Sequence, residues 1–224
     1  DGWVSYASIS TWDNGTIKTT ATTNTAWIRQ NGVTTANKHY KVTFKAKASN
    51  ISQNIKIYDG TFADTGLSFD AVDVYQEFTY YSYTTVTNII LGQQGLSAGD
   101  TINFDNVSVV EVGQDWDLGT GWSISDDKVV AVNGNSYGTF QGGVTQTNKN
   151  YKVIYTIEDY ISGTVNYRMY TLNLETRNAN GTYTEYFTSV GSYLYIQGGN
   201  DFNGSITNIS VKEVGQDWSL GAGW

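Results

Sequence analysis

The sequence predicts an all-β protein built from two tandem antiparallel β-sandwiches. Three observations lead to this prediction. A twelve-residue phrase occurs twice, a second motif recurs inside each copy, and short alternating runs of β-branched and aromatic residues fill the rest of the 224 residues. Such runs, bounded by Gly, Asn and Asp, are typical of half-buried strands joined by tight turns, and helical periodicity is hard to find anywhere.

The repeated phrase is EVGQDWDLGTGW at residues 111–122, which returns as EVGQDWSLGAGW at residues 213–224. Ten of its twelve positions are identical, and two of these are Trp. The chain also opens on Asp1-Gly2-Trp3, which resembles the end of the phrase and would align Trp3 with Trp122. The repeating unit is the size of one domain, too long for a solenoid repeat.

The second motif is VTTANKHYKV at residues 33–42, which aligns without a gap with VTQTNKNYKV at residues 144–153. The copies differ in length on both sides of it, and we expect those differences in loops. The predicted organisation is a first sandwich over residues 1–112, a Gly/Trp junction over 113–122, a second sandwich over 123–214, and the start of a further junction over 215–224. In this prediction the chain is a piece of a longer array, and four residues pack between neighbouring domains: Trp116, Trp122, Trp218 and Trp224.

The individual strands follow from alternation. Residues 40–48 (YKVTFKAKA) place Tyr, Val, Phe and Ala on one face and Lys and Thr on the other, and residues 75–85 form the most aromatic strand. Eight or so short strands in about 100 residues suit a two-sheet sandwich. The predicted strands are 16–23, 26–30, 40–48, 54–58, 75–85, 87–91 and 102–112 in the first copy, and 129–132, 137–141, 151–157, 164–174, 183–188, 193–197 and 206–214 in the second.

Composition excludes several classes of function. A net charge of −8 argues against a nucleic-acid binder, which needs a basic surface. The absence of Cys excludes disulfides and Cys-based metal sites, and a single His, His39, excludes a His-based zinc site or a Ser-His-Asp triad in each copy. No apolar run is long enough to span a membrane. The scarcity of charge and the abundance of Thr, Asn, Ser, Gly and Tyr suit an extracellular or particle-surface β protein.

Two parts of the sequence resemble a known family. Residues 75–85 and 102–111 resemble the C-terminal half of carbohydrate-binding jelly rolls of the family 4/9/22 type, and residues 39–49 (HYKVTFKAKAS) resemble an earlier strand of that group. The end of the second copy, residues 192–215, is similar to such domains in tail, fibre and other virion proteins of bacteriophages. This resemblance implies a jelly-roll fold and recognition of polysaccharide.

Sugar-binding jelly rolls use exposed aromatic rings, because the C–H face of a pyranose stacks on a flat apolar ring while polar neighbours bond its hydroxyls. Trp27 aligns with Gly138, and losing a shared core Trp would leave a hole costing about 3–5 kcal/mol. We therefore expect Trp27 to face outward or to lie at an edge, as a ligand contact, as edge packing or as a contact to a neighbouring domain. The candidate sugar-binding residues are Trp12, Trp27, Arg29, Gln76, Tyr81, Tyr83, Tyr137 and Phe140.

Other aromatic residues of the second copy have a plainer interpretation, because tyrosines in strands are more often half-buried filler of a sheet than a binding platform. This interpretation covers Tyr167, Tyr170, Tyr183, Tyr186, Tyr193 and Tyr195.

The resemblance also bears on metal binding. Asp105 lies where these jelly rolls carry an acidic residue of a structural calcium site, although the second copy has Thr207 there. Calcium needs six to eight oxygen ligands, so a second acid would be required, and a surface Asp at a strand start is the alternative. No other cofactor is expected.

Catalysis is not predicted. The adjacent acids Glu158 and Asp159 could in principle supply two carboxylates for glycoside hydrolysis, but nothing comparable recurs in the other copy.

The functional hypothesis is a non-catalytic pair of modules in an extended virion or cell-surface protein. The modules would attach to surface polysaccharide and contact neighbouring repeats or other virion subunits. Many weak sites on one fibre would gain avidity. Two alternatives remain: spacer domains without a ligand, and accessory modules of a secreted polysaccharide-degrading enzyme.

Overall fold

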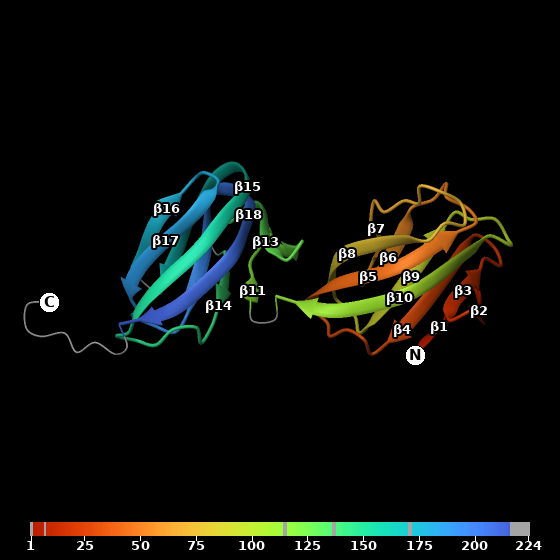
Figure 1. Cartoon of the computed structure of the whole chain (residues 1–224), viewed down its shortest axis with the longest axis horizontal. Coiled ribbons are helices and arrows are strands. Elements are labelled where there is room, and N and C mark those ends of the chain that lie inside the picture. The colour runs from red at the N-terminus through yellow and green to blue at the C-terminus, as the bar shows by residue number, and fades with distance from the viewer. Residues whose placement is uncertain (1, 7, 114–115, 136–137, 170–171, 216–224) are drawn as a thin grey trace, which may run out of the picture. The chain divides into compact units, whose positions relative to one another are not determined.

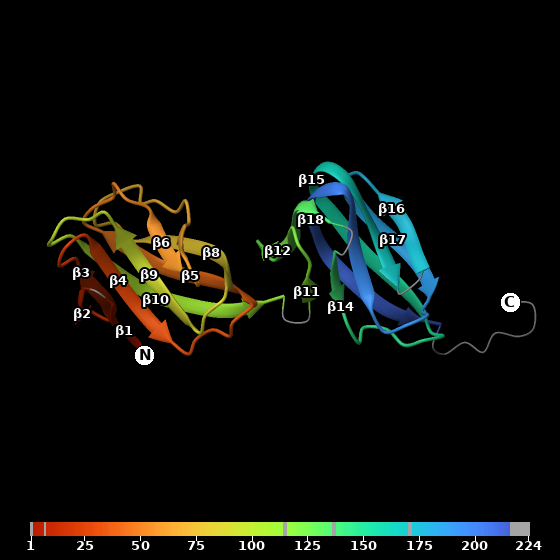
Figure 2. The same cartoon turned by 180° about the vertical axis from the view of Figure 1, so that it is seen from behind.

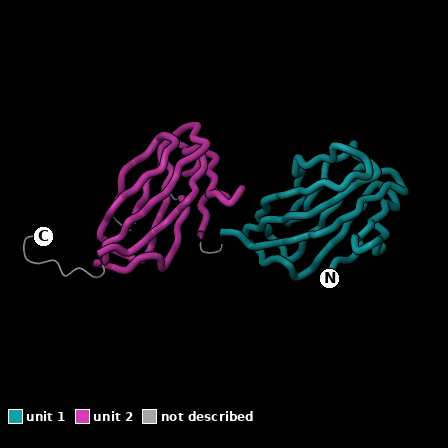
Figure 3. Tube along the Cα trace, in the orientation of Figure 1, with its two compact units in different colours: residues 1–114 teal, residues 115–224 magenta. Residues whose placement is uncertain are grey.

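The computed structural model describes residues 2–6, 8–113, 116–135, 138–169 and 172–215. It divides into two compact units, Asp1–Gln114 and Asp115–Trp224 (Figure 3). Each unit is an antiparallel β-sandwich, so the predicted all-β, tandem jelly-roll class is confirmed. In the described part of the chain there is no helix that could cross a membrane.

The first unit consists of two sheets packed face to face. One has the strand order β1-β4-β9-β6-β7 and the other the order β2-β3-β10-β5-β8. Figures 1 and 2 view these layers from opposite sides, with β5, β8 and β10 in front in Figure 1 and β4, β6 and β9 in front in Figure 2. The strands are β1 (Trp3–Tyr6), β2 (Ile9–Asp13), β3 (Thr16–Thr20), β4 (Thr25–Asn31), β5 (Lys38–Ala48), β6 (Ile55–Tyr58), β7 (Phe62–Asp64), β8 (Gln76–Thr84), β9 (Asn88–Gln94) and β10 (Thr101–Val112).

The core of this unit lies between the sheets and follows the predicted alternation. On β5 the residues from Tyr40 to Ala48 alternate between buried apolar and half-buried polar side chains. Phe44 stacks on Phe78 of β8 with ring centroids 5.3 Å apart and meets Phe104 of β10 at 5.9 Å. The facing sheet contributes the inward residues of β4, β6 and β9: Ala26, Ile28, Ile55, Ile57, Ile89 and Leu91.

The second unit repeats this connectivity with two long strands that take part in several pairings. β15 pairs with β17 and β18 along its first half and with β16 and β18 along its second half. β18 pairs with β14 near its start and with β13 further on. The strands are β11 (Trp116–Leu118), β12 (Trp122–Ser125), β13 (Lys128–Gly134), β14 (Thr139–Gln141), β15 (Asn150–Met169), β16 (Leu172–Arg177), β17 (Gly181–Thr188) and β18 (Leu194–Val214).

The second repeated motif proves to be a turn that fastens the start of β5 and of β15. Tyr40 accepts a hydrogen bond at its hydroxyl from the backbone N–H of Thr35 (2.7 Å), and Tyr151 accepts the equivalent bond from Gln146 (2.9 Å). Asn37 takes the left-handed conformation that this turn needs, with φ of 64°, as does its counterpart in the second unit. The shared residues are therefore structural.

The same strands are tied to the end of each unit by an ion pair. Lys38 lies 3.2 Å from Glu111, and Lys149 lies 3.1 Å from Glu213. The glutamates open the twelve-residue phrase, so part of its repetition reflects this contact within a unit.

The predicted alignment of Trp3 with Trp122 is wrong. Trp3 pairs with Gln30, and Trp116 pairs with Gln141, so the first strands β1 and β11 correspond and Trp3 matches Trp116. The error arose because Gly2-Trp3 matches Gly121-Trp122 in sequence, whereas Trp116 follows Asp115, and only strand pairing shows that Trp3 and Trp116 correspond.

The predicted separate junction over residues 113–122 is also wrong, because β11 and the start of β12 belong to the second unit. Trp122 is 6% exposed and stacks on Phe202 of β18 (ring centroids 6.0 Å apart), so it is a core residue of that unit. Trp116 is half-buried in β11, next to β14. Trp218 and Trp224 lie outside the described residues.

Most predicted strands correspond to strands in the structure, with ends that shift by a few residues. The predicted single strand over 164–174 is wrong, because β15 ends at Met169 and β16 begins at Leu172 as its antiparallel partner. β1, β2, β7, β11 and β12 were not predicted. They are short strands near Gly, Asn and Asp turns, where alternation extends over too few residues to be recognised.

Candidate functional site

The outer face of the β1-β4-β9-β6-β7 sheet in the first unit carries a compact group of aromatic side chains. Strand register sets Tyr6 beside Trp27 and, one row away, Tyr58 beside Phe62. These residues alternate with the inward residues that form the core, so they point away from it. We call Tyr6, Trp27, Arg29, Tyr58 and Phe62 the first aromatic face.

The rings of this face are in mutual contact. Phe62 lies over Trp27 with ring centroids 5.0 Å apart, and Tyr58 meets Phe62 at 4.8 Å. Phe62 remains 45% exposed and Tyr6 37% exposed, whereas Trp27 is only 3% exposed. Trp27 is therefore the floor of the face, and Phe62 and Tyr6 are the rings that solvent reaches.

The expectation that Trp27 faces outward or lies at an edge is wrong with respect to exposure, although the residue does point away from the main core. Gly92 on β9 lies under the indole, since a β-carbon there would come within 2.5 Å of Cε3 of Trp27. In the second unit the backbone of β18 lies against Gly138, since a β-carbon there would meet the carbonyl oxygen of Ile196 and Cα of Gln197. The second unit thus has no space for a side chain at this position, and one aligned position could not reveal that.

Arg29 supplies the charged group of the face. Its guanidinium carbon lies 5.1 Å from the centroid of the Tyr6 ring, and its Nε has no hydrogen-bond partner. On the same face, one row further along β9, Oδ1 of Asn88 is also buried without a partner. Both atoms are buried, so they lie beneath the surface that a ligand would contact, and the charge of the guanidinium is what Arg29 contributes to the face.

A polar rim borders the face on the side of β6 and β7. Lys56 and Asp64 are paired across these strands. The side-chain amide of Asn54 lowers the pKa of the Asp64 carboxyl, and the backbone N–H of Gly66 and the charge of Lys56 act in the same direction. Asp64 is therefore an ionised acceptor at neutral pH.

Tyr81 and Tyr83, two further candidates, lie on the outer face of the opposite sheet. Nζ of Lys41 sits 5.5 Å from the Tyr81 ring centroid, and His39 lies 4.9 Å from the Tyr83 ring. Burial lowers the pKa of His39, so this imidazole is neutral at pH 7. These tyrosines are separated from the first aromatic face by the whole core.

Gln76, another candidate, points toward the inner side of β8, as Phe78 does. Its Oε1 accepts a hydrogen bond from the backbone N–H of Asp70 (3.1 Å), so it fastens the loop before β8. The structure thus does not bring the candidates of the first copy into one site. Trp27 and Arg29 lie together on one sheet, and Tyr81 and Tyr83 lie together on the other.

Trp12 is the most exposed indole described, at 63%, on the edge strand β2. It borders a surface hollow of about 490 Å³ at an open end of the sandwich. The other lining residues are Trp3, Gly15, Ile17, Gln30, Phe104, Asp105, Asn106 and Val107.

In the second unit, Phe140 occupies the outer face of the corresponding sheet. It lies 5.2 Å from Tyr195 and 5.9 Å from Tyr193, and Arg168 pairs with Tyr195 across the strands. Phe140, Arg168, Tyr193 and Tyr195 form the second aromatic face. Tyr137, the remaining candidate, lies outside the described residues.

The interpretation of the tyrosines as filler fits some of them and not others. Tyr167 is completely buried in the core, whereas Tyr186 and Tyr193 are exposed. Tyr170 lies outside the described residues.

Sequence reasoning missed Tyr6, Tyr58 and Phe62. For the last two a signal was available, because residues 58–62 read YDGTF, an Asp-Gly turn flanked by aromatic residues. Such a turn closes a hairpin and sets its flanking residues opposite one another on one face.

At Asp105 the described residues do not assemble a calcium site. One carboxylate oxygen accepts a hydrogen bond from the backbone N–H of Asn106 (2.8 Å), and Lys45 is the cross-strand neighbour. Within the ranges that the structure describes, no group of three His, Cys, Asp or Glu side chains is placed to hold an ion.

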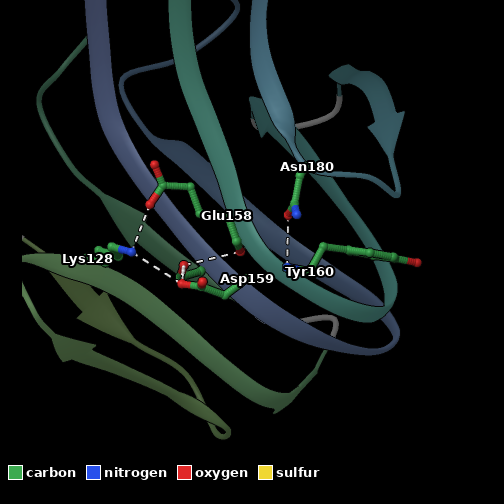
Figure 4. Close-up of polar contacts among 6 residues, drawn as sticks. Lys128, Glu158, Asp159, Tyr160 and Asn180 are labelled. Carbon is green, nitrogen blue, oxygen red and sulfur yellow. Dashed lines mark hydrogen bonds and ion pairs between the residues drawn. The ribbon is translucent and has the colours of Figure 1, made fainter.

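The acid pair considered for catalysis is neutralised by a lysine (Figure 4). Nζ of Lys128 lies 2.8 Å from Glu158 and 3.2 Å from Asp159. The hydroxyl of Ser205 donates to Asp159 (2.7 Å), and this bond, with Lys128, lowers the pKa of Asp159. Hydrolysis requires one carboxyl that stays protonated, which a lysine between the two acids opposes.

No protein-family model and no curated protein matches this sequence. Among solved structures the chain is similar to a CBM4 structure, with 22% identity over 48% of this chain and 77% of that one and a TM-score of 0.34. It is also similar to the CBM22-1-CBM22-2 tandem domain of Paenibacillus barcinonensis Xyn10C, with 10% identity, coverage of 95% and 93%, and a TM-score of 0.35. A third similarity is to tandem CBM51 modules of a family 98 glycoside hydrolase from Streptococcus pneumoniae, with 9% identity, coverage of 91% and 86%, and a TM-score of 0.32.

Proposed function

We propose that this chain is a non-catalytic pair of carbohydrate-binding modules, and that the first aromatic face is a binding site for polysaccharide. The observation that carries the proposal is the combination on one sheet face of two exposed rings, Tyr6 and Phe62, with the guanidinium of Arg29 against the Tyr6 ring. A sugar ring needs a flat apolar surface for its C–H groups and polar groups for its hydroxyls, and this face offers both.

The open geometry of the face favours an internal stretch of a chain. The rings lie on the surface of a sheet and not in an enclosed cavity, so a polysaccharide can lie across the strands and extend beyond both edges. The second aromatic face carries the same types of group on the corresponding sheet, with different residues. We therefore expect it to bind as well, with a different preference.

The experiment is a glycan array with the complete chain and three variants. Phe62→Ala and Tyr6→Ala each remove an exposed ring and are expected to weaken binding about tenfold or more, since about 1.4 kcal/mol of lost stacking is a factor of ten. Tyr83→Ala is the matched control, because it removes an equally exposed ring from the other sheet and should leave the binding profile unchanged. Equal loss in all three variants, or no loss in the first two, would reject this face as the site.

We further propose that the modules belong to an extended array on a virion or cell surface, where repeated weak sites give avidity. The recurrence of the phrase of residues 111–122 at residues 213–224, one domain length later, is the observation behind this proposal. The accessory-module and spacer alternatives make different predictions. A flanking glycosidase domain in the full-length sequence would support the accessory-module alternative. A glycan array on which the chain binds no glycan would support the spacer alternative.

A further inference from the structure

We infer that the hollow beside Trp12 is a second saccharide site of the first unit, and that it accepts the end of a sugar chain. This site shares no residue with the first aromatic face. The two proposals can therefore fail separately.

The hollow lies at one end of the sandwich, where the two sheets leave the core open to solvent. Ile17 and Phe104 form its floor, and both belong to the hydrophobic core. Trp12 of the β2-containing sheet and Trp3 of the β1-containing sheet line it from the two layers. A ligand that enters between the layers meets the core, so a chain cannot pass through and only its end can be seated.

Trp12 is the reason to assign a ligand. A single exposed apolar side chain needs no explanation, but the Trp12 indole lines the hollow together with Trp3, Ile17 and Phe104, and a contiguous apolar surface of this kind marks a site that a ligand covers. Its cross-strand neighbour is Ile17, so its side chain starts from the inner face of the sheet and leans over the hollow and not over the outer surface. The indole is therefore placed as one wall, against which a pyranose can stack.

The polar groups of the hollow come from a bulge in β10. Pairing between β10 and β5 is interrupted between Asp105 and Ser108, and Asn106 adopts a left-handed φ of 50°. Such a bulge leaves backbone groups without ladder partners. Asn106 and Gln30 from β4 line the hollow, and Asp105 borders it, although the cross-strand neighbour Lys45 sets the Asp105 side chain on the outer face of the sheet. An aromatic wall beside amide groups is the chemistry of a sugar site, because a sugar presents both a C–H face and hydroxyls.

The second unit supplies an internal comparison. Its counterparts of Trp3, Gln30 and Asn106 are Trp116, Gln141 and Asn208, and Asn208 has the same left-handed conformation (φ 53°). These three lining positions of the hollow are thus retained in the second unit. The indole proposed to hold the sugar is not, because strand pairing puts Ile124 in place of Trp12.

The test uses the complete chain labelled with 5-fluorotryptophan and followed by fluorine NMR. Trp12 reports on the hollow, Trp27 reports on the first aromatic face, and Trp122 in the core of the second unit is the unliganded reference. Trp12→Phe and Trp27→Phe variants assign the two resonances. The probes are soluble xylans, glucans, mannans and galactans, each supplied intact and after partial acid hydrolysis, which multiplies chain ends at constant mass.

We expect at least one hydrolysed probe to shift the Trp12 resonance, with a response that grows with the number of chain ends. The Trp27 resonance should respond to intact and hydrolysed polymer alike. Trp12→Ala should abolish binding at the hollow without affecting the Trp27 response, and its high exposure makes misfolding a minor concern. Asn106→Gly, which keeps the left-handed backbone and removes the side-chain amide, should weaken the response of Trp12 severalfold.

Two outcomes would overturn this inference. One is a Trp12 resonance that does not move with any probe. The other is a Trp12 response that is independent of hydrolysis. If Trp12 responds and Trp27 does not, the hollow is retained and the proposed role of the first aromatic face fails. If Trp27 responds and Trp12 does not, the reverse holds.

Discussion

The two units share a backbone frame and differ in the side chains placed on it. In both, a Tyr hydroxyl fastens a left-handed Asn turn, and a Lys–Glu pair ties the long central strand to the end of the unit. The outer face of the corresponding sheet is different in each. The first unit has Trp27 above Gly92, whereas the second has Gly138 against Gln197.

The difference teaches that a large ring on the outer face needs space beside the neighbouring strand. Trp27 fits because Gly92 has no side chain there, whereas backbone atoms of β18 occupy the space beside Gly138. The inner faces instead pack ring against ring in both units. Phe44 and Phe78 meet in the first unit, and Tyr155 with Tyr183 in the second, where the Tyr155 hydroxyl donates to the buried Glu185 (2.8 Å).

The largest expected effect concerns this buried acid. Glu185→Ala leaves the Tyr155 hydroxyl and the backbone N–H of Glu175 without their acceptor and Arg177 without its ion pair. We expect the second unit to lose about 3 kcal/mol of stability, since breaking a buried polar network strands its partners. Amide hydrogen exchange on the whole chain reads the two units separately. Unchanged exchange in the second unit would show that the network contributes nothing.

A slightly smaller effect is expected where Trp27 rests on β9. Gly92→Ala puts a β-carbon against the indole and against the Ala26 carbonyl, so the ring or the strand must shift. Overpacking of this kind costs about 2 kcal/mol, and it should also displace Phe62 and weaken glycan binding. Gly143→Ala is the matched control in the second unit, because nothing lies near its β-carbon position, although its positive φ adds a small strain. If Gly92→Ala leaves glycan binding unchanged, the position of Trp27 does not matter for the binding site.

The shared turn offers a test of equivalence between the units. Tyr40→Phe and Tyr151→Phe each remove one hydroxyl that accepts a backbone N–H, and each should cost about 1 kcal/mol in its own unit. The two losses in the free energy of unfolding should agree closely. Each is measured from amide hydrogen exchange in its own unit as denaturant is added. A clear difference between the two losses would mean that the turn has the same geometry in both units but does not stabilise them equally.

The smallest effect is a dependence on pH confined to the second unit. Ser205 and Lys128 hold the pKa of Asp159 below its ordinary value of 3.8. A depressed folded-state pKa contributes stability above the unfolded value, and this contribution is lost as the pH falls through the folded value. With Asp159→Asn, the stability of the second unit should therefore fall less steeply as the pH drops below about 4, and the first unit should not change. Because the carboxylate is exposed, the change should be small, and it should disappear in high salt.

Features that depend on residues close together in the sequence could be predicted, whereas contacts between distant strands could not. Alternation at residues 40–48 and the recurrence of the NKxYK motif were enough for the fold, because each strand carries its own two-residue period. Trp27 and Arg29 were selected correctly as neighbours, since they lie two residues apart on one strand. Phe62 was missed because its contact with Trp27 depends on β9 and β6 lying between β4 and β7.

The sequence by itself determined the class of fold, the duplication and the facing of most strands, since these depend on local periodicity and on identity between the copies. Only the tertiary structure decided which Trp begins a unit, that Trp122 is core, and that Trp27 is covered while Trp12 is not. Exposure is a property of packing between strands far apart in the chain, and a ring that points away from one core can still be buried by the side chain of a strand that the sequence places elsewhere.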